Sequence, residues 1–224
     1  DLVLCKGDGT PVSEGGGLAW VDPASQEVWD YLLEIAQDAA RAGFDEVQLD
    51  YVRYPAVPGL PEEDRQGYIT GFLEYIREGL HQKDVWLSAD VFGTVIDSAL
   101  DARQIGQSYP AMAQAADFIC PMIYPSHYAA GAYGLDVPDQ APYETGRAAL
   151  DRSRKALDGL EEPAGVRAWL QGFTATWVRG HIPYGGEELR AQIQAVYDAG
   201  YTDWIIWNAN NTYSADGLLP AEGD

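Results

Sequence analysis

Two aspartates beside apolar runs are the residues in this chain best suited to chemistry. Asp50 lies in the stretch DEVQLDYVRYP, in which apolar and polar residues alternate, and Asp90 lies near the end of the apolar run VWLSADV. Two carboxylates at neighbouring strand ends can flank a glycosidic bond, one protonated as general acid and the other ionised as nucleophile or base. The sequence therefore predicts Asp50 and Asp90 as the catalytic pair of a glycoside hydrolase. The structural alternative is that Asp50 pairs with Arg53 and Asp90 caps a loop.

Polar and aromatic residues follow the same apolar runs. The predicted substrate-binding residues are Arg53, Tyr54, Tyr124, His127, Gln171, Trp207 and Asn208. Aromatic rings near strand ends suit sugar binding, because the apolar faces of pyranose rings stack on them. Alternatives stay open for three of these residues: Arg53 can pair with a carboxylate and keep it ionised, His127 can be merely solvated, and Trp207 can be core.

The elements that must position these residues alternate as helix and strand. Apolar residues recur at helical spacing over residues 22–42, 62–81, 143–160 and 187–199, with shorter helical pieces at 102–105 and 110–116. The predicted strands are residues 47–51, 85–91, 118–124, 166–172 and 204–207. Asp22 is the predicted N-cap of the first helix, with Pro23 at its first position, and residues 1–17 are predicted to be a loop.

The strands are apolar on both faces, as expected for a parallel sheet covered by helices. Such α/β folds place their ligand sites at the carboxyl ends of the strands. The five βα units predicted here are fewer than the eight of a TIM barrel. Two interpretations are therefore open: a smaller open sheet, or a barrel without its first three units.

Composition excludes several classes of protein. The 224 residues are 46% hydrophobic and 22% charged, which suits one folded domain. The net charge of -21 argues against nucleic acid and anionic membrane surfaces as partners, and no apolar run is long enough to span a membrane. The histidines are scattered, so we expect no metal and no cofactor. Because the first residue is Asp1, the chain is expected to be a processed product, an excised domain or a fragment, whose signal peptide, if any, is not visible.

The motifs FDEVQLDYVRYP, LSADVFG, FICPMIYPSHY, RAWLQGF and WIIWNANNTY together resemble a bacterial family described as a "putative glycosyl hydrolase domain". The resemblance spans essentially the whole chain. It implies a TIM-type (β/α)8 barrel in which residues 1–224 form a single domain that holds strands four to eight and lacks the first three βα units. It also implies an extracytoplasmic or cell-surface location and a polysaccharide or glycan substrate. The alternative is a non-catalytic carbohydrate-binding or cell-surface barrel module.

A more distant similarity is to family-18 chitinases, whose fourth strand reads D-x-x-D-x-D-x-E. Asp45 and Asp50 match the first and third acids of that pattern, Gln48 replaces the middle one, and Val52 stands where the catalytic glutamate would be. A chitinase mechanism using that glutamate is therefore unsupported. The α-amylase type of barrel instead has an aspartate nucleophile on strand four and an acid on strand five, positions that Asp50 and Asp90 match by analogy.

Overall fold

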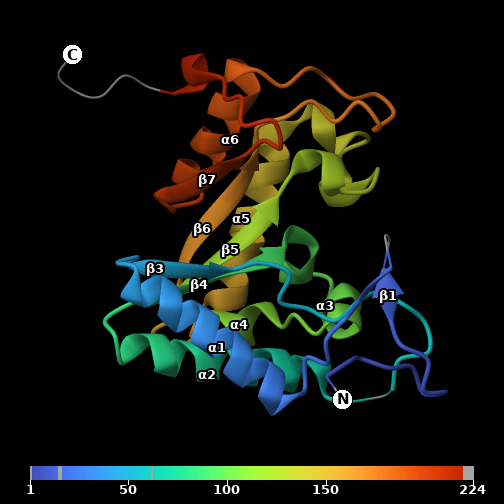
Figure 1. Ribbon diagram of the computed structural model, residues 1–224. Helices are drawn as coiled ribbons and strands as arrows, with labels where there is room; N and C mark the ends of the chain where they lie inside the picture. The colour runs from blue at the N-terminus through green and yellow to red at the C-terminus, as the bar shows by residue number, and fades with distance from the viewer. Residues whose placement is uncertain (1, 15–16, 62, 219–224) are drawn as a thin grey trace. The chain divides into compact units, whose positions relative to one another are not determined.

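The computed structural model describes residues 2–14, 17–61 and 63–218 (Figure 1). Its helices are α1 (Gln26–Arg41), α2 (Arg65–His81), α3 (Ala99–Ile105), α4 (Tyr109–Ala115), α5 (Pro142–Leu157) and α6 (Gly186–Asp198). Its strands are β1 (Ser13–Glu14), β2 (Leu18–Ala19), β3 (Glu46–Leu49), β4 (Trp86–Phe92), β5 (Phe118–Ile123), β6 (Gly165–Gln171) and β7 (Asp203–Trp207). Short 3-10 turns are η1 (Gly93–Ile96), η2 (Pro125–His127), η3 (Ala132–Gly134), η4 (Pro138–Gln140) and η5 (Ala215–Gly217).

The described residues form the α/β fold that the alternating pattern predicts. A five-stranded sheet has the order β3-β4-β5-β6-β7, so consecutive strands are neighbours. The register is parallel, with Leu49 beside Ala89 in one pair and Leu170 beside Ile206 in another. Helices connect the strands, because parallel neighbours need a crossover.

The amino-terminal segment contains more structure than the predicted loop. β1 and β2 pair antiparallel, and Val3 and Cys5 form isolated bridges with Val21 and Pro11. Leu4 and Val12 are 3% and 1% exposed, so they anchor this segment by burial. Because this segment is rich in Gly and polar residues, the sequence carries no signal that two of its apolar side chains are buried.

The predicted start of the first helix is too early. α1 begins after Ser25, and Asp22 instead accepts a hydrogen bond from Ala24 N–H at 2.9 Å in the turn before the helix. The predicted start at Glu62 lies outside the described residues. α2 begins at Arg65, and the Asp64 carboxylate caps it by accepting from Gly67 N–H at 2.9 Å.

The prediction that Tyr51 belongs to a buried strand is wrong. β3 ends at Leu49, and Tyr51 has φ +58°, a left-handed conformation that breaks the strand. Its side chain is 68% exposed. The strand is itself only partly buried, because β3 is at one end of the sheet order and has a single described neighbour, β4.

The chain divides into two compact units, each with its own core. Unit 1 comprises residues 1–91, 98–119 and 160–165, and unit 2 comprises 92–97, 120–159 and 166–224. In unit 1, α1 packs beside α2 (Figure 1), and its fully buried side chains include Leu73, Ile76, Leu80, Leu87 and Met112. In unit 2, α5 packs beside α6, and its fully buried side chains include Ile123, Leu150, Leu170, Ile193 and Val196.

A charged cluster joins α2 to β4 within unit 1. Asp117 accepts hydrogen bonds from Arg77 Nε at 2.9 Å and from the Leu87 backbone N–H at 2.8 Å, and His81 Nε2 lies 2.9 Å from the same carboxylate. Burial alone would raise the pKa of Asp117, but the hydrogen bonds from Leu87 and His81 and the charge of Arg77 outweigh it, so the pKa lies below its ordinary value of 3.8.

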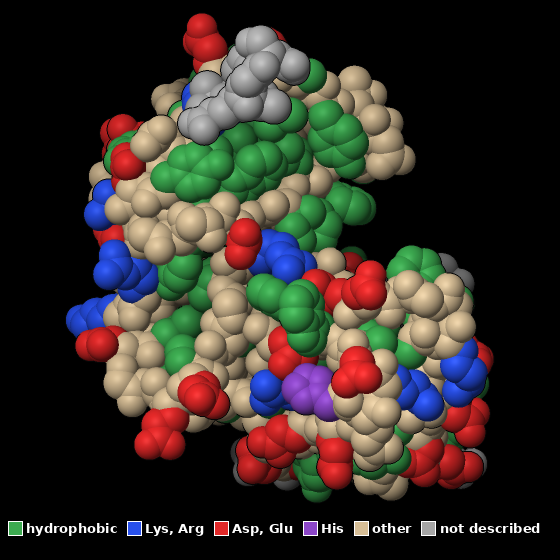
Figure 2. Space-filling model, turned by 90° about the vertical axis from the view of Figure 1, so that its left-hand side faces the viewer, with side chains coloured by type: hydrophobic (Ala, Val, Ile, Leu, Met, Phe, Trp, Pro, Cys, Tyr) green, Lys and Arg blue, Asp and Glu red, His purple; other side chains and the backbone are tan. Residues whose placement is uncertain are grey.

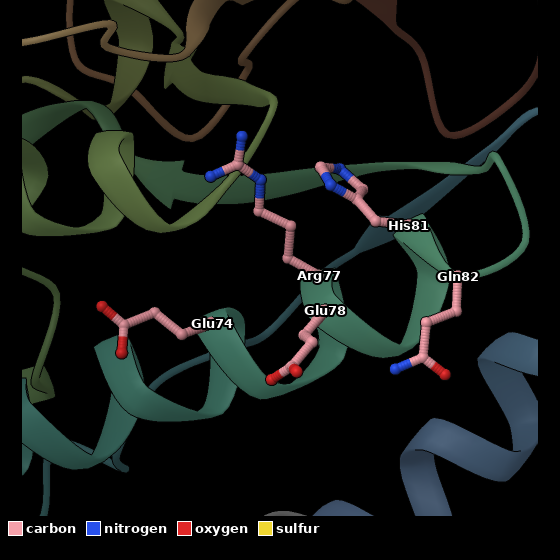
Figure 3. Close-up of a pocket in the computed structure, with 5 residues that line it drawn as sticks. All are labelled: Glu74, Arg77, Glu78, His81 and Gln82. Atoms are coloured by element: carbon pink, nitrogen blue, oxygen red, sulfur yellow. The ribbon is translucent and has the colours of Figure 1, made fainter.

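The same cluster explains a shallow pocket on α2. It is lined by Glu74, Arg77, Glu78, His81 and Gln82 (Figure 3). Arg77 and His81 extend to one side of the helix, where they hold Asp117, and Glu78 and Gln82 point away from them. Arg77 and His81 are thus already engaged with Asp117, so we assign these two pocket residues a structural role.

Asp117→Asn should lower the free energy of unfolding at pH 7 by about 1–3 kcal/mol, because the amide cannot satisfy Arg77, His81 and Leu87 together. Folding lowers the pKa of Asp117, so its contribution is present above 3.8 and is lost as the pH falls through the folded-state pKa. Urea unfolding of variant and wild type should therefore converge as the pH drops below 3.8. Glu78→Gln, an exposed change on the same helix, is the control; equal losses in both variants would contradict the assignment.

Candidate functional site

The strand register brings Asp50 and Asp90 to neighbouring positions in unit 1. Leu49 on β3 is the partner of Ala89 on β4, and each aspartate is the next residue along its strand direction. Because side chains alternate along a strand, Asp90 shares a face of the sheet with Ser88, and Gln48 shares the corresponding face of β3. Asp50 thus follows the last paired residue of β3, and Asp90 lies within β4 beside that end, while the pairing of their carboxylates stays a prediction.

The two carboxylates have different surroundings. Asp90 is 5% exposed, and its Oδ1 accepts a hydrogen bond from Gln48 Nε2 at 2.6 Å. Asp50 is exposed, and its Oδ1 accepts from the backbone N–H of Tyr51 at 2.7 Å. Ser88 is fully buried, and its hydroxyl has no hydrogen-bond partner among the described residues. Gln48, which replaces an acid of the chitinase pattern, therefore supports Asp90.

A buried glutamine links the two strand ends. Gln107 is 1% exposed, and its Nε2 donates to the carbonyls of Val52 at 3.1 Å and Asp90 at 3.3 Å. Val52 itself is buried, so the position of the chitinase glutamate is filled by a core side chain. Sequence reasoning missed Gln107, because a single polar residue between two short helices carries no periodic signal.

Arg53 and Tyr54 are placed differently from the other predicted binding residues. The Arg53 guanidinium lies over the rings of Trp20 and Tyr51, with centroid distances of 5.0 and 5.3 Å, and donates to the Tyr54 carbonyl at 3.1 Å. Tyr54 is 0% exposed, so its ring is part of the core of unit 1. The contact of Tyr54 with a sugar stays a prediction, which this burial does not favour. Burial also raises the pKa of the Tyr54 hydroxyl, an effect that the charges of Glu63 and Asp22 increase.

Four aromatic side chains gather in unit 2, and we call this cluster the aromatic shelf: Tyr124, His127, Phe173 and Trp177. Phe173 and Trp177 are stacked at 6.0 Å with an interplanar angle of 21°. The His127 ring meets both of them edge-on, at 6.3 Å in each case, and meets Tyr124 at 5.3 Å. Two of the predicted binding residues therefore lie in one cluster with two aromatic residues that were not predicted.

Beneath the shelf is a polar network. Gln171 is fully buried; its Oε1 accepts from Ser126 N–H at 3.0 Å, and its Nε2 donates to Asp139 Oδ1 at 3.0 Å. Asp139, 1% exposed, also accepts from Ile182 N–H at 3.2 Å. Both ends of the Gln171 amide thus bind protein groups, and its contact with substrate stays a prediction. Gln171 positions the loop that carries His127, since Ser126 Oγ lies 2.9 Å from His127 Nδ1.

The last predicted residues follow β7. Trp207 is 45% exposed and packs edge-on against Trp169 at 6.0 Å, so its side chain is partly exposed and partly packed. Asn208 is 9% exposed; its amide donates to the Gly172 carbonyl and its Oδ1 accepts from Asn210 N–H at 2.8 Å. Asn208 therefore fixes the loop after β6 to the loop after β7, and any contact of either residue with substrate stays a prediction.

Within the described residues, no group of three or more His, Cys, Asp or Glu side chains is arranged to hold a metal ion. Across the same residues, none of the helices combines the length and the apolarity needed to cross a membrane. Acidic side chains are spread over the face seen in Figure 2.

The sequence matches a family profile described as "Putative glycosyl hydrolase domain" over residues 1–213. The chain belongs to this family. No curated protein matches it significantly. The family membership predicted from the five motifs is therefore confirmed.

Solved structures show the barrel type of fold. The glycoside hydrolase domain of PgaB (BpsB) from Bordetella bronchiseptica is 20% identical with a TM-score of 0.62, and the alignment covers 92% of this chain and 64% of that one. A class V chitinase from Pseudomonas fluorescens is 13% identical (TM-score 0.62; 87% and 72% covered). The spore cortex-lytic enzyme SleL from Bacillus megaterium is 13% identical (TM-score 0.59; 87% and 53% covered). The chain thus spans less than two thirds of the first and last of these proteins.

His127 should titrate below its ordinary pKa of 6.5, because burial against the aromatic rings disfavours the charged ring while the Asp139 carboxylate opposes this effect. Asp139→Asn should lower the pKa of His127 further, since it removes the opposing charge. An NMR pH titration of the His127 ring protons measures both values. Asp136→Asn, an exposed change in the same loop, should leave the titration unchanged; a rise in pKa for Asp139→Asn would contradict the assigned cause.

Proposed function

We propose that this family member hydrolyses glycosidic bonds with Asp50 and Asp90 as its carboxylate pair. The observation that supports the proposal best is the register of β3 and β4, in which Leu49 pairs with Ala89 and an aspartate follows each of them in the sequence. Carboxyl ends of parallel strands are where barrel enzymes hold their catalytic groups. The family description and the glycoside hydrolase neighbours are consistent with this chemistry.

The contrast in burial suggests a role for each acid. Asp90 is buried, and burial favours the neutral form of a carboxyl group, which suits a general acid that gives its proton to the departing glycosidic oxygen. Asp50 is exposed, which suits an ionised carboxylate that attacks the anomeric carbon or activates a water. As the carbon–oxygen bond breaks, the leaving sugar takes the proton of Asp90, and Asp50 or the water forms the new bond.

A glycan that carries amino sugars is the proposed substrate class. Two further neighbours were solved with carbohydrates: Aspergillus fumigatus Ega3 with galactosamine (12% identical, TM-score 0.53) and bee venom hyaluronidase with a hyaluronic acid tetramer (9%, 0.52). Galactosamine is a hexosamine, and hyaluronic acid contains one. Chitinases act on a polymer of a hexosamine as well. The net charge of -21 disfavours a polyanion such as hyaluronic acid, so a neutral or amine-bearing glycan is preferred.

We further propose that the five strands correspond to strands four to eight of an eight-stranded barrel. Two observations support this assignment: β3 and β7 are the ends of the described sheet, and hydrophobic side chains form a broad area on the face seen in Figure 2. Exposed apolar areas of this kind mark interaction surfaces. A structure of a longer parent protein in which β3 or β7 is still an edge strand would refute the assignment.

A non-catalytic carbohydrate-binding module is the second candidate. It is favoured by one observation: Val52, a buried apolar residue, occupies the position of the chitinase glutamate. Such a module would bind glycans without turnover, and binding would not depend on the Asp90 carboxylate.

Asp50→Asn and Asp90→Asn should each lower kcat on a chitooligosaccharide by about 10²-fold or more, with a far smaller change in KM, because each removes a group that acts in the transition state. Reducing-sugar release measures turnover, and circular dichroism checks folding. The control is Asp45→Asn, an exposed aspartate immediately before β3, which should retain activity within about twofold. Full activity in both site variants would exclude the pair, and binding without turnover in the wild type would favour the second candidate.

A further inference from the structure

Trp177 is the most exposed tryptophan among the described residues, at 68%, and yet its ring is held in place. It stacks on Phe173 at 6.0 Å, and His127 closes one edge at an interplanar angle of 90°. A fixed ring with one open face is the geometry that a planar or flat apolar ligand surface requires.

The loop that carries Trp177 is anchored on both sides of the ring. On one side, the Phe173 carbonyl accepts from Gln171 Nε2 at 3.0 Å. On the other, Val178 N–H donates to the Ala175 carbonyl at 2.9 Å, and Ala175 is fully buried. Thr174 Oγ1 accepts from Tyr184 N–H at 3.0 Å. Binding at Trp177 would therefore cost little loop ordering, which favours affinity.

A polar group stands at the edge of this surface. His127 uses Nδ1 for its contact with Ser126 Oγ at 2.9 Å, so Nε2 is the ring nitrogen that can meet a ligand hydroxyl. Burial lowers the pKa of the His127 ring, which favours the neutral ring that can donate or accept at that nitrogen. The buried Gln171–Asp139 pair fixes the loop behind it.

We propose that the aromatic shelf is a sugar-binding subsite of unit 2, in which the apolar face of one pyranose ring stacks on Trp177 and a hydroxyl of that sugar bonds to His127 Nε2. The combination of an open aromatic face and one edge-mounted polar group is the recognition chemistry of a sugar ring, whose faces are apolar and whose rim carries hydroxyls. The inference rests on the proposed glycan substrate but not on the roles of Asp50 and Asp90. Trp177 binds and does no chemistry.

The test is a titration of the chain with soluble tetrasaccharides of N-acetylglucosamine and of glucose. Binding is followed by the indole N–H resonances in ¹H–¹⁵N NMR spectra, with Trp177 assigned by its loss in Trp177→Phe. At least one tetrasaccharide should shift the Trp177 resonance. Trp177→Ala should raise the Kd by about tenfold or more, as expected for loss of a stacking platform, and Trp177→Phe should raise it less, because a ring remains.

The matched control is Trp86→Ala, which removes another exposed tryptophan, 55% accessible, from unit 1. It should change the Kd less than about twofold. His127→Ala should weaken binding, and His181→Ala, which removes an exposed histidine, should not. The inference is overturned if no tetrasaccharide shifts the Trp177 resonance, or if Trp177→Ala binds as the wild type does.

The same titration in the Asp50→Asn/Asp90→Asn double variant separates this inference from the proposed function. Sugar binding at Trp177 that persists there, with no turnover in the wild type, would reject the hydrolase and keep the subsite. Turnover in the wild type that is unaffected in kcat and KM by Trp177→Ala would reject the subsite and keep the hydrolase.

Discussion

Backbone pairing between β3 and β4 is the constraint on which the proposed chemistry depends. Parallel hydrogen bonds fix Leu49 beside Ala89, and the residue that follows each of them is an aspartate. A slip of one residue would turn one of the two acids to the opposite face of the sheet. The register is in turn held by groups outside the strands, since Gln107 bonds to the carbonyl of Asp90 on β4 and to that of Val52 beyond β3.

Buried polar residues recur at the points where loops must be held still. Asp117 ties α2 to β4, Gln107 ties two strand ends together, and Asp139 supports the loops around the aromatic shelf through Gln171. Each is nearly or largely removed from water, and each has several hydrogen-bond partners, as buried polar groups require. The three networks stiffen the backbone locally. The segments that carry exposed side chains such as Asp50 and Trp177 are therefore held in place.

The sequence predicted the order of elements well, because helical periodicity and apolar strand runs report directly on burial. It predicted Asp90 within a strand, as the structure has it, whereas Asp50 follows the end of β3 at Leu49. The burial of Tyr54 and Gln171 could not be predicted from the sequence, because both follow strands as binding residues would and a tertiary contact decides their exposure. Trp177 was visible as a loop tryptophan, yet only the stacking on Phe173 distinguishes it from an incidental surface residue.

The ends of the described sheet have a consequence for how the chain behaves in concentrated solution. β3 and β7 each have one described neighbour, so their outer backbone groups can pair with the same edge of another molecule. The net charge of -21 opposes such an approach at low ionic strength. Because the screening length falls from about 30 Å at 0.01 M salt to about 3 Å at 1 M, salt removes this repulsion while the edges stay open. The acidity of the chain therefore acts as its colloidal protection, and that protection is strongest in dilute buffer.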